Sequence, residues 1–303
     1  MKRDNPFQGM LRLLIRRYGQ IAFHLMDYVV IGYVAAIGMV IIPFHHNVSQ
    51  WGFYPLRHFL IGILLLELLR AYTQRPTKLL RFLRTFYPLF LMGFTWTELN
   101  GIVTMVFPFW ASHWVVTIDK LIFSVHPTVW VAKFFRPWLT ELMNFFYASY
   151  FFFIPVSACL LYFRGRQKET LDFLFLVYLT YYASFLCFFL FPAEGAWIIL
   201  KHLHTVEPKG GFFLKFNQFM QSQGSIRGGA LPSSHVSVAF TVVLANVKYQ
   251  KKVAIVFLPL ALGIALATVY CQYHHAIDSL AGMVLGILLY FVGILILRKK
   301  KTP

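Results

Sequence analysis

Long apolar runs separated by short polar segments dominate the chain. Eight of these runs are long enough, or nearly so, to cross a bilayer of about 30 Å as helices. The pattern therefore predicts an all-α polytopic membrane protein with about eight transmembrane helices. Their approximate bounds are 21–44, 59–74, 87–107, 138–163, 170–192, 234–248, 253–273 and 279–297.

Two further segments do not have the pattern of a membrane span. Residues 108–136 mix aromatic with charged residues around Pro127, which predicts one or two helices lying at the outer membrane interface. Residues 193–231 contain glycines and no long apolar run, so we expect an outer loop there, long enough to be functional.

Composition supports the membrane assignment. Hydrophobic residues make up 58% of the 303 positions and charged residues 13%, whereas soluble domains have about 45–50% and about 25%. The three cysteines, Cys159, Cys187 and Cys271, fall in or beside apolar runs and form neither a disulfide framework nor a metal-binding spacing.

The net charge of +17 reflects topology rather than a nucleic-acid partner, because the basic residues cluster in short loops. Twenty of the 28 Lys and Arg residues fall on the side of the membrane that carries both predicted termini, and eight on the opposite side. Both termini are therefore expected to face the cytoplasm. We expect a multi-pass protein of a bacterial inner membrane or a eukaryotic endomembrane.

The first candidate motif is Ala230-Leu231-Pro232-Ser233-Ser234-His235, at the start of the sixth run. Pro and Ser favour helix starts, and a helix N-terminus with free N–H groups and serine hydroxyls can bind phosphate. His235 lies in the first turn, where a general acid would have to stand. The alternative is an ordinary capped helix start with an interfacial histidine.

The second motif is Tyr273-His274-His275-Ala276-Ile277-Asp278, between the last two runs. His274 and Asp278 are four residues apart and share one face of a helix. An aspartate bonded to one imidazole nitrogen fixes the tautomer and leaves the other nitrogen as a nucleophile. The predicted topology brings this pair and His235 to the same outer face, although a pair that only satisfies itself remains the alternative.

Together the two motifs resemble the type-2 phosphatidic acid phosphatase superfamily, and most closely its inositol phosphorylceramide synthase branch. The resemblance covers about 109–290 and includes Ile118-Asp119-Lys120 and His126-Pro127-Thr128. It implies a six-helix core, with His274 as the phosphoryl-accepting nucleophile, Asp278 as its orienting partner and His235 as the acid that protonates the leaving oxygen.

This resemblance also suggests a division of the chain. Residues 1–20 would be a basic cytoplasmic terminus, 21–86 two accessory helices, 87–297 the catalytic domain and 298–303 a basic cytoplasmic tail. The implied substrates are membrane lipids: a lipid phosphate or phospholipid donor, with a lipid alcohol as acceptor if the reaction is transfer. No metal or other cofactor is expected, and the sequence does not indicate an oligomeric state.

The sequence departs from the phosphatase branch where that branch places phosphate-binding cations. Thr268 stands six residues before His274, where those phosphatases have Arg, and the synthase branch also lacks that Arg. Arg227 and then Lys201 are the candidate replacements, with Ser233 and Ser234 at the phosphate and Glu194 as a substrate contact. Each of the two cations has the alternative of an ordinary loop residue that faces lipid headgroups.

Other polar residues have structural explanations. Glu98 lies within a predicted span and is expected either to bond a partner helix or to line a substrate route. His202 and His204 lack a third ligand at the spacing of a metal site. Gly282 and Gly286 predict close helix packing directly after Asp278.

The sequence thus favours a phosphohistidine enzyme that transfers a phospho-headgroup between lipids. The alternative is a lipid-phosphate phosphatase, in which water takes the phosphate. A transporter is the alternative of a different class, but it gives no reason for the two motifs to meet. A di-iron lipid oxidase is disfavoured because the histidines do not form repeated paired boxes.

The topology is directly testable. A reporter fused after Pro303 should be active only as a cytoplasmic reporter, because basic loops stay on the cytoplasmic side. Paired fusions to alkaline phosphatase and green fluorescent protein measure this. A C-terminus found outside would contradict the predicted orientation.

Overall fold

The computed structural model describes residues 15–300, and over that range the chain is helical without any strand. All eight predicted apolar runs are helices, which confirms the all-α class. They are α2 (Leu25–Val40), α3 (Phe53–Gln74), α4 (Lys78–Ile102), α7 (Pro137–Phe163), α8 (Gln167–Leu190), α11 (Ser234–Tyr249), α12 (Lys251–Tyr270) and α13 (Ala276–Lys299).

Fewer than the predicted eight helices qualify as membrane spans. In the described range, four helices are by themselves both long and apolar enough to cross a membrane: α7, α8, α12 and α13. Helices α2 and α11 have only 16 residues each, and α3 and α4 carry charged side chains such as Arg57 and Glu98, which pair inside the protein. On length and composition the expected eight spans are therefore four, or five with the bent pair described next.

The segment predicted to lie at the interface forms helices α5 (Ser112–Phe123) and α6 (Pro127–Trp130), followed by the 3-10 helix η2 (Val131–Phe134). The chain bends by 66° between α5 and the segment Pro127–Phe134. By length and composition, α5 and this segment together are compatible with a broken membrane span or with a re-entrant loop. Ser124, in the left-handed conformation at φ 60°, ends α5.

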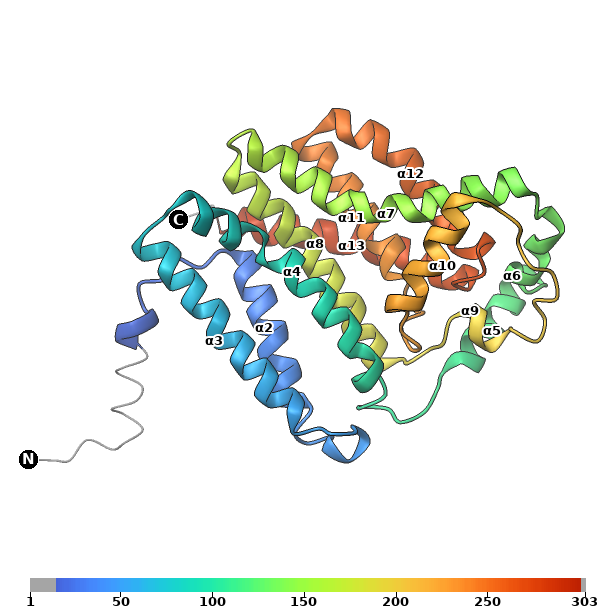
Figure 1. Ribbon diagram of the computed structural model, residues 1–303, viewed down its shortest axis with the longest axis horizontal. Coiled ribbons are helices and arrows are strands. Elements are labelled where there is room, and N and C mark those ends of the chain that lie inside the picture. The colour runs from blue at the N-terminus through green and yellow to red at the C-terminus, as the bar shows by residue number, and fades with distance from the viewer. Residues whose placement is uncertain (1–14, 301–303) are drawn as a thin grey trace, which may run out of the picture.

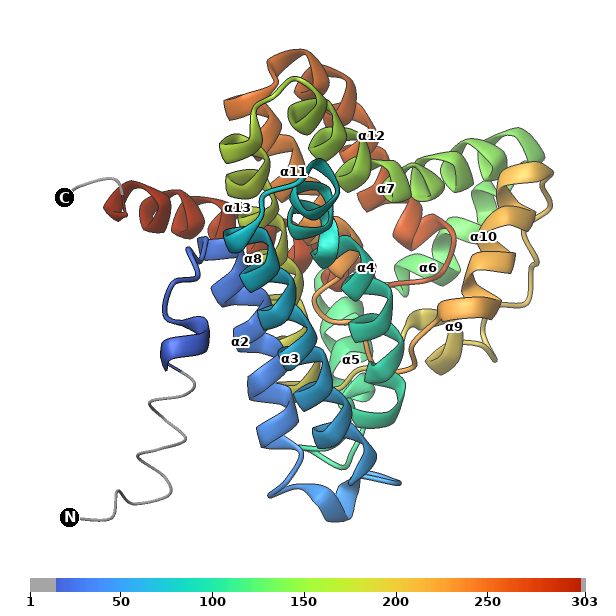
Figure 2. The ribbon, with the colours of Figure 1, turned by 60° about the vertical axis from the view of Figure 1, so that its left-hand side comes forward.

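The long helices form two groups around α8 (Figures 1 and 2). Helices α2, α3 and α4 lie side by side, and α2 and α4 contact α8. On the other side α11 packs against α7, α8, α12 and α13. Small residues of α11 permit this central position, and the hydroxyls of Thr180 and Ser184 on α8 bond those of Thr241 and Ser237 on α11 at 2.9 and 3.0 Å.

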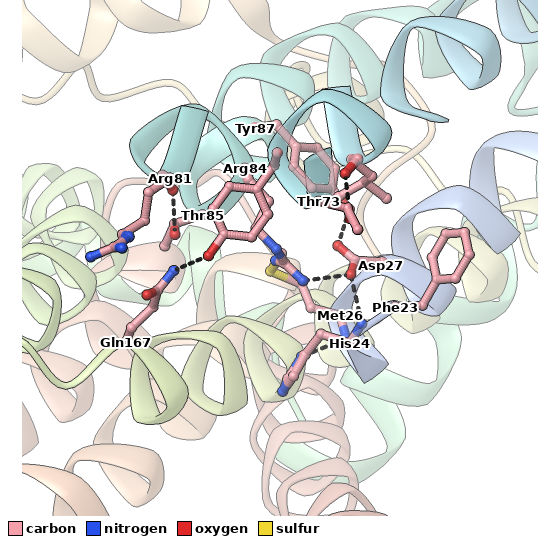
Figure 3. A network of polar contacts seen from close by, with 12 residues as sticks. Phe23, His24, Met26, Asp27, Thr73, Arg81, Arg84, Thr85, Tyr87 and Gln167 are labelled. Atoms are coloured by element: carbon pink, nitrogen blue, oxygen red, sulfur yellow. Dashed lines mark hydrogen bonds and ion pairs between the residues drawn. The ribbon is translucent and has the colours of Figure 1, made fainter. Parts of the chain in front are cut away.

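A buried ionic network joins α2 to α4 and α8 (Figure 3). The carboxylate of Asp27 accepts bonds from the Arg84 guanidinium at 2.7 Å and the Tyr87 hydroxyl at 3.0 Å, both on α4. His24, at the N-cap of α2, lies 3.1 Å from Asp172 on α8. Helix α2 thus has polar connections to α4 and α8 as well as apolar ones.

Glu98 makes the second buried ionic contact among these helices. Its carboxylate lies 2.6 Å from the Arg57 guanidinium and 2.9 Å from Nε2 of His58, both on α3, while Nδ1 of His58 bonds the Val34 carbonyl. Of the two roles considered for Glu98, the structure shows the bond to a partner helix.

The segment predicted as an outer loop contains a helix that the apolar pattern did not indicate. Helix α10 (Phe212–Gly224) follows the short helix α9 (Ala196–Ile199). Glu141 of α7 caps it by accepting bonds from the N–H groups of Gly211, Phe213 and Leu214 at 2.6–3.1 Å. Because the capping residue lies about 70 positions away in the sequence, no local pattern predicts where this helix begins.

The Asp27 network predicts a large effect on stability. Asp27→Ala leaves Arg84, whose side chain is 5% exposed, without its carboxylate, and should lower the free energy of unfolding by about 3–5 kcal/mol. Denaturant unfolding in detergent measures this. Glu169→Ala, which breaks the half-exposed pair with Arg166, should cost less than about 1 kcal/mol, and equal effects would contradict the argument.

Candidate active site

The site lies where the first turns of α11 and α13 meet. The N–H of Ser233, the N-cap of α11, donates to the carbonyl of Asp278 on α13 at 2.9 Å. A Cβ on Gly282 would approach the Ser233 carbonyl oxygen to 2.5 Å, and one on Gly286 would collide with that of Ser237. The two glycines therefore permit the close packing expected of them, and this packing joins the two sequence motifs.

His274 and Asp278 lie together, as their spacing predicts. Nδ1 of His274 is 3.5 Å from Oδ2 of Asp278 and 3.1 Å from the carbonyl oxygen of Ala230. Both neighbours are acceptors, so Nδ1 carries the proton and Nε2 keeps its lone pair. The carbonyl of Ala230 belongs to the first motif, which means that each motif helps to fix the other.

The segment that supplies this carbonyl is itself held in place. Gly229 forms an isolated bridge with Ala193, and the N–H of Ala230 donates to the Ala193 carbonyl at 3.1 Å. The two ends of segment 193–231 thus meet beside His274.

Asp119 of α5 is a further site residue, and no role was predicted for it. Its two carboxylate oxygens accept the N–H groups of Ile277 at 2.9 Å and Ala276 at 3.3 Å, and so cap the first turn of α13. The signal was present in the Ile118-Asp119-Lys120 stretch that supported the family resemblance. Asp119 holds the backbone that carries Asp278.

His275 completes this support. Its N–H donates to Oδ2 of Asp278 at 2.8 Å, and its ring lies 3.9 Å from the Asp119 carboxylate. The ring is fully buried, and this burial lowers the pKa of His275 below its ordinary value, so the neutral form is favoured. His275 packs against Asp119 and Asp278 and does not line the cavity.

His235 lies near His274, with 6.2 Å between the ring centroids. Aromatic side chains surround it: Tyr147 stacks on the ring at 5.1 Å, and Trp96 of α4 meets it edge-on at 6.0 Å. The Tyr147 hydroxyl is 3.3 Å from Nε2 of His235. Neither Tyr147 nor Trp96 stands out in the sequence, because aromatic residues occur throughout the apolar runs.

A cavity of about 320 Å³ connects these groups. His235, His274 and Ser234 line it, whereas Ser233 and Asp278 lie behind that lining as fully buried residues. The remaining lining is mainly aromatic and aliphatic and comes from α4, α7, α8, α10 and the outer segment. A small number of polar groups in an apolar cavity is the usual composition of a small-molecule site.

The other predicted contacts lie outside the cavity lining. Nε of Arg227 donates to Glu194 at 2.7 Å, and the guanidinium stacks over Trp110 at 4.9 Å. Glu194 is buried and also accepts from the Ser112 hydroxyl at 3.1 Å. Lys201 is exposed in the turn after α9. The phosphate-binding roles of Arg227 and Lys201 and the substrate-contact role of Glu194 stay predictions.

Thr268 has a structural role at the position where the phosphatase branch has Arg. Its backbone carbonyl accepts the N–H groups of Tyr273 and His274, each at 3.0 Å, and its hydroxyl lies 2.6 Å from that of Ser279. The side chain is fully buried. Thr268 therefore shapes the turn that presents His274 instead of contributing a positive charge.

The paired loop histidines do not form a metal centre, and the described residues hold no cluster of three or more His, Cys, Asp or Glu suited to a metal ion. Nε2 of His204 bonds the Thr128 hydroxyl at 3.2 Å, and His202 is exposed. Burial lowers the pKa of His204 from its ordinary value.

Comparison with known proteins assigns the family. The model of the PAP2 superfamily matches residues 113–292, more than half of the 303-residue chain, and this range contains His235, His274 and Asp278. The chain belongs to this superfamily and is a lipid enzyme of the phosphatase or phosphotransferase type. No curated protein and no solved structure matches it.

The close packing of α11 and α13 predicts that Gly286→Ala damages the site. The new methyl group would meet the backbone oxygen of Ser237, so the helices must separate at a cost of about 1–3 kcal/mol, and turnover of lipid phosphate should fall. Thermal unfolding and phosphate release measure the two effects. Gly62→Ala on α3 adds its methyl group in open space and should change neither; a variant Gly286→Ala with normal stability and turnover would refute the packing argument.

Proposed function

We propose that this enzyme transfers a phospho-headgroup from one membrane lipid to another through a covalent intermediate on His274. The observation that carries the proposal is the position of Nδ1 of His274 between two acceptors, the Ala230 carbonyl and the Asp278 carboxylate. This arrangement leaves Nε2 as the nucleophile, in a cavity that it shares with His235.

In the first step Nε2 of His274 attacks the phosphorus of the donor lipid. The bond from phosphorus to the donor's alcohol oxygen breaks and its electron pair stays on that oxygen. His235, which the negative charge of the bound phosphate favours in its protonated form, supplies the proton. The positive charge that develops on His274 is stabilised by Asp278, which is fully buried and is held by the N–H of His275.

In the second step the neutral His235 accepts the proton of an acceptor alcohol. The alcohol oxygen bonds to phosphorus while the bond from phosphorus to Nε2 breaks, and its electron pair returns to His274. With water as acceptor the same step is hydrolysis. The phosphate oxygens would be bound by Ser234 and by the free N–H groups of the first turn of α11.

Transfer is favoured over hydrolysis by the surroundings of the site. The cavity is lined mainly by aromatic and aliphatic side chains, which suit a lipid acceptor better than they suit water. In addition, buried Thr268 occupies the position of a phosphate-binding Arg of the phosphatase branch. These features support an activity similar to that of inositol phosphorylceramide synthases, at the outer membrane face, with hydrolysis as the second candidate.

The transporter alternative has no supporting contact among the described residues. Glu98, the residue that suggested it, bonds Arg57 and His58 and does not line the cavity.

Product analysis tests the proposal. The purified protein is given ³²P-labelled phosphatidylinositol or phosphatidic acid together with ceramide or diacylglycerol. We expect a new labelled lipid; free labelled phosphate from phosphatidic acid would instead indicate hydrolysis. His274→Ala should reduce either product by more than about 10³-fold, because it removes the nucleophile.

The matched control is His202→Ala, which removes an exposed loop histidine and should leave turnover unchanged. Normal turnover in His274→Ala would falsify the phosphohistidine mechanism. The label on wild-type protein should also be stable in alkali and labile in acid, as expected for a phosphorus–nitrogen bond.

A further inference from the structure

Helix α4 lies before the stretch that matches the superfamily, yet it forms one wall of the cavity. The matched region begins at residue 113, whereas α4 ends at Ile102. Four residues from about one turn of α4 line the cavity: Met92, Gly93, Trp96 and Thr97. Trp96 also contacts the ring of His235. A part of the chain that precedes the matched region therefore reaches the site.

The opposite wall comes from α7, and the two helices separate as they approach the site. Near one end their rings are in contact, with Tyr162 of α7 5.1 Å from Phe86 and 6.0 Å from Phe82 of α4. Further along both helices the cavity lies between them, where α7 contributes Tyr147, Tyr150, Phe151, Ile154 and Pro155.

Helix α10 bridges the two walls (Figure 1). On the α7 side the Asn217 amide donates to the backbone and side-chain oxygens of Asn144, each at 2.9 Å. On the α4 side the Trp96 indole donates to the Gly224 carbonyl, and the Asn100 amide donates to the Ser225 carbonyl at 3.0 Å. Asn217, Met220 and Gln221 line the cavity beneath this bridge.

The rim of the cavity continues into an apolar surface. Gly93, Thr97 and Phe151 line the cavity and are exposed. Beside them, Phe90 on α4 and Phe152 on α7 are 66% and 61% exposed. In a membrane protein, exposed aromatic residues of this kind face lipid. A chain entering from the bilayer between α4 and α7 would thus meet an apolar path that leads to His235 and His274.

Gly93 provides room on this path. A Cβ at this position would meet no atom within 4 Å, whereas a Cβ on Gly38 of α2 or on Gly101, further along α4, would collide with His58 or Tyr54. Packing inside the protein therefore gives no reason for glycine at 93, and glycine within a helix is unfavourable by about 1 kcal/mol relative to alanine.

We propose that a hydrocarbon chain of the lipid substrate lies between α4 and α7 beneath α10, and that Gly93 determines which chains are accepted. The proposal rests on the proposed function for the position of the phosphate at His274. It makes α4, which precedes the region matched by the superfamily model, a specificity element.

The test is photo-crosslinking with phosphatidic acid that carries a diazirine in one acyl chain. We expect labelled peptides from α4 around 92–97 and from α7 around 147–155, competed by unlabelled phosphatidic acid. Gly93→Phe fills the path and should lower this crosslinking about tenfold, the effect of displacing one to two buried methylene groups. It should also shift turnover from dipalmitoyl towards dioctanoyl phosphatidic acid.

Gly32→Phe is the matched control, because Gly32 is also an exposed helical glycine with no atom within 4 Å of its Cβ, but it lies on α2 outside the cavity lining. It should leave crosslinking and chain preference unchanged. Equal crosslinking in wild type and Gly93→Phe, or labelling spread evenly over the lipid-facing helices, would overturn the proposal.

The crosslinking is repeated with His274→Ala. This variant lacks the proposed nucleophile, so lipid binding can be measured without turnover. Labelling of α4 and α7 in this variant supports the chain site even if the product analysis contradicts the phosphohistidine. Turnover that depends on His274, together with labelling outside α4 and α7, instead supports the reaction and refutes the chain site.

Discussion

The close approach of α11 and α13 is the constraint on which the site depends. Glycines at 282 and 286 let the backbones come together, and the N–H of Ser233 then bonds the Asp278 carbonyl. This contact brings the Ala230 carbonyl to Nδ1 of His274 and sets His235 beside the same cavity. A larger side chain at either glycine would separate two motifs that stand about 40 residues apart, because packed helices cannot accommodate an added methyl group without moving.

Helix ends near the site are held by side chains from remote parts of the sequence. Asp119 of α5 caps α13, and Glu141 of α7 caps α10. Each supplies a carboxylate to N–H groups that have no partner within their own helix and that favour negative charge. These caps place the first turn of α13, which carries Asp278, and the bridge over the cavity relative to the same scaffold.

The accessory helix α2 is connected to α4 and α8 by buried polar contacts as well as by apolar packing. Asp27 with Arg84 joins α2 to α4, and His24 with Asp172 joins α2 to α8. Charges in such surroundings are stable only when paired, so they fix the position of one helix against another more specifically than apolar contacts do. The position of α4 in turn affects the active site, because Trp96 of α4 contacts the ring of His235.

The helical class and the pairing of His274 with Asp278 can be predicted from the sequence, because apolar runs and a four-residue spacing are local properties, and the two motifs indicate the PAP2 superfamily. The cap on α10, the role of Asp119, the bond between Arg227 and Glu194, and the contribution of α4 to the cavity are visible in the folded structure alone. It also reduced the spans that qualify on length and composition to four or five. Each of these depends on contacts between residues far apart in the chain, and neither hydropathy nor spacing encodes such contacts.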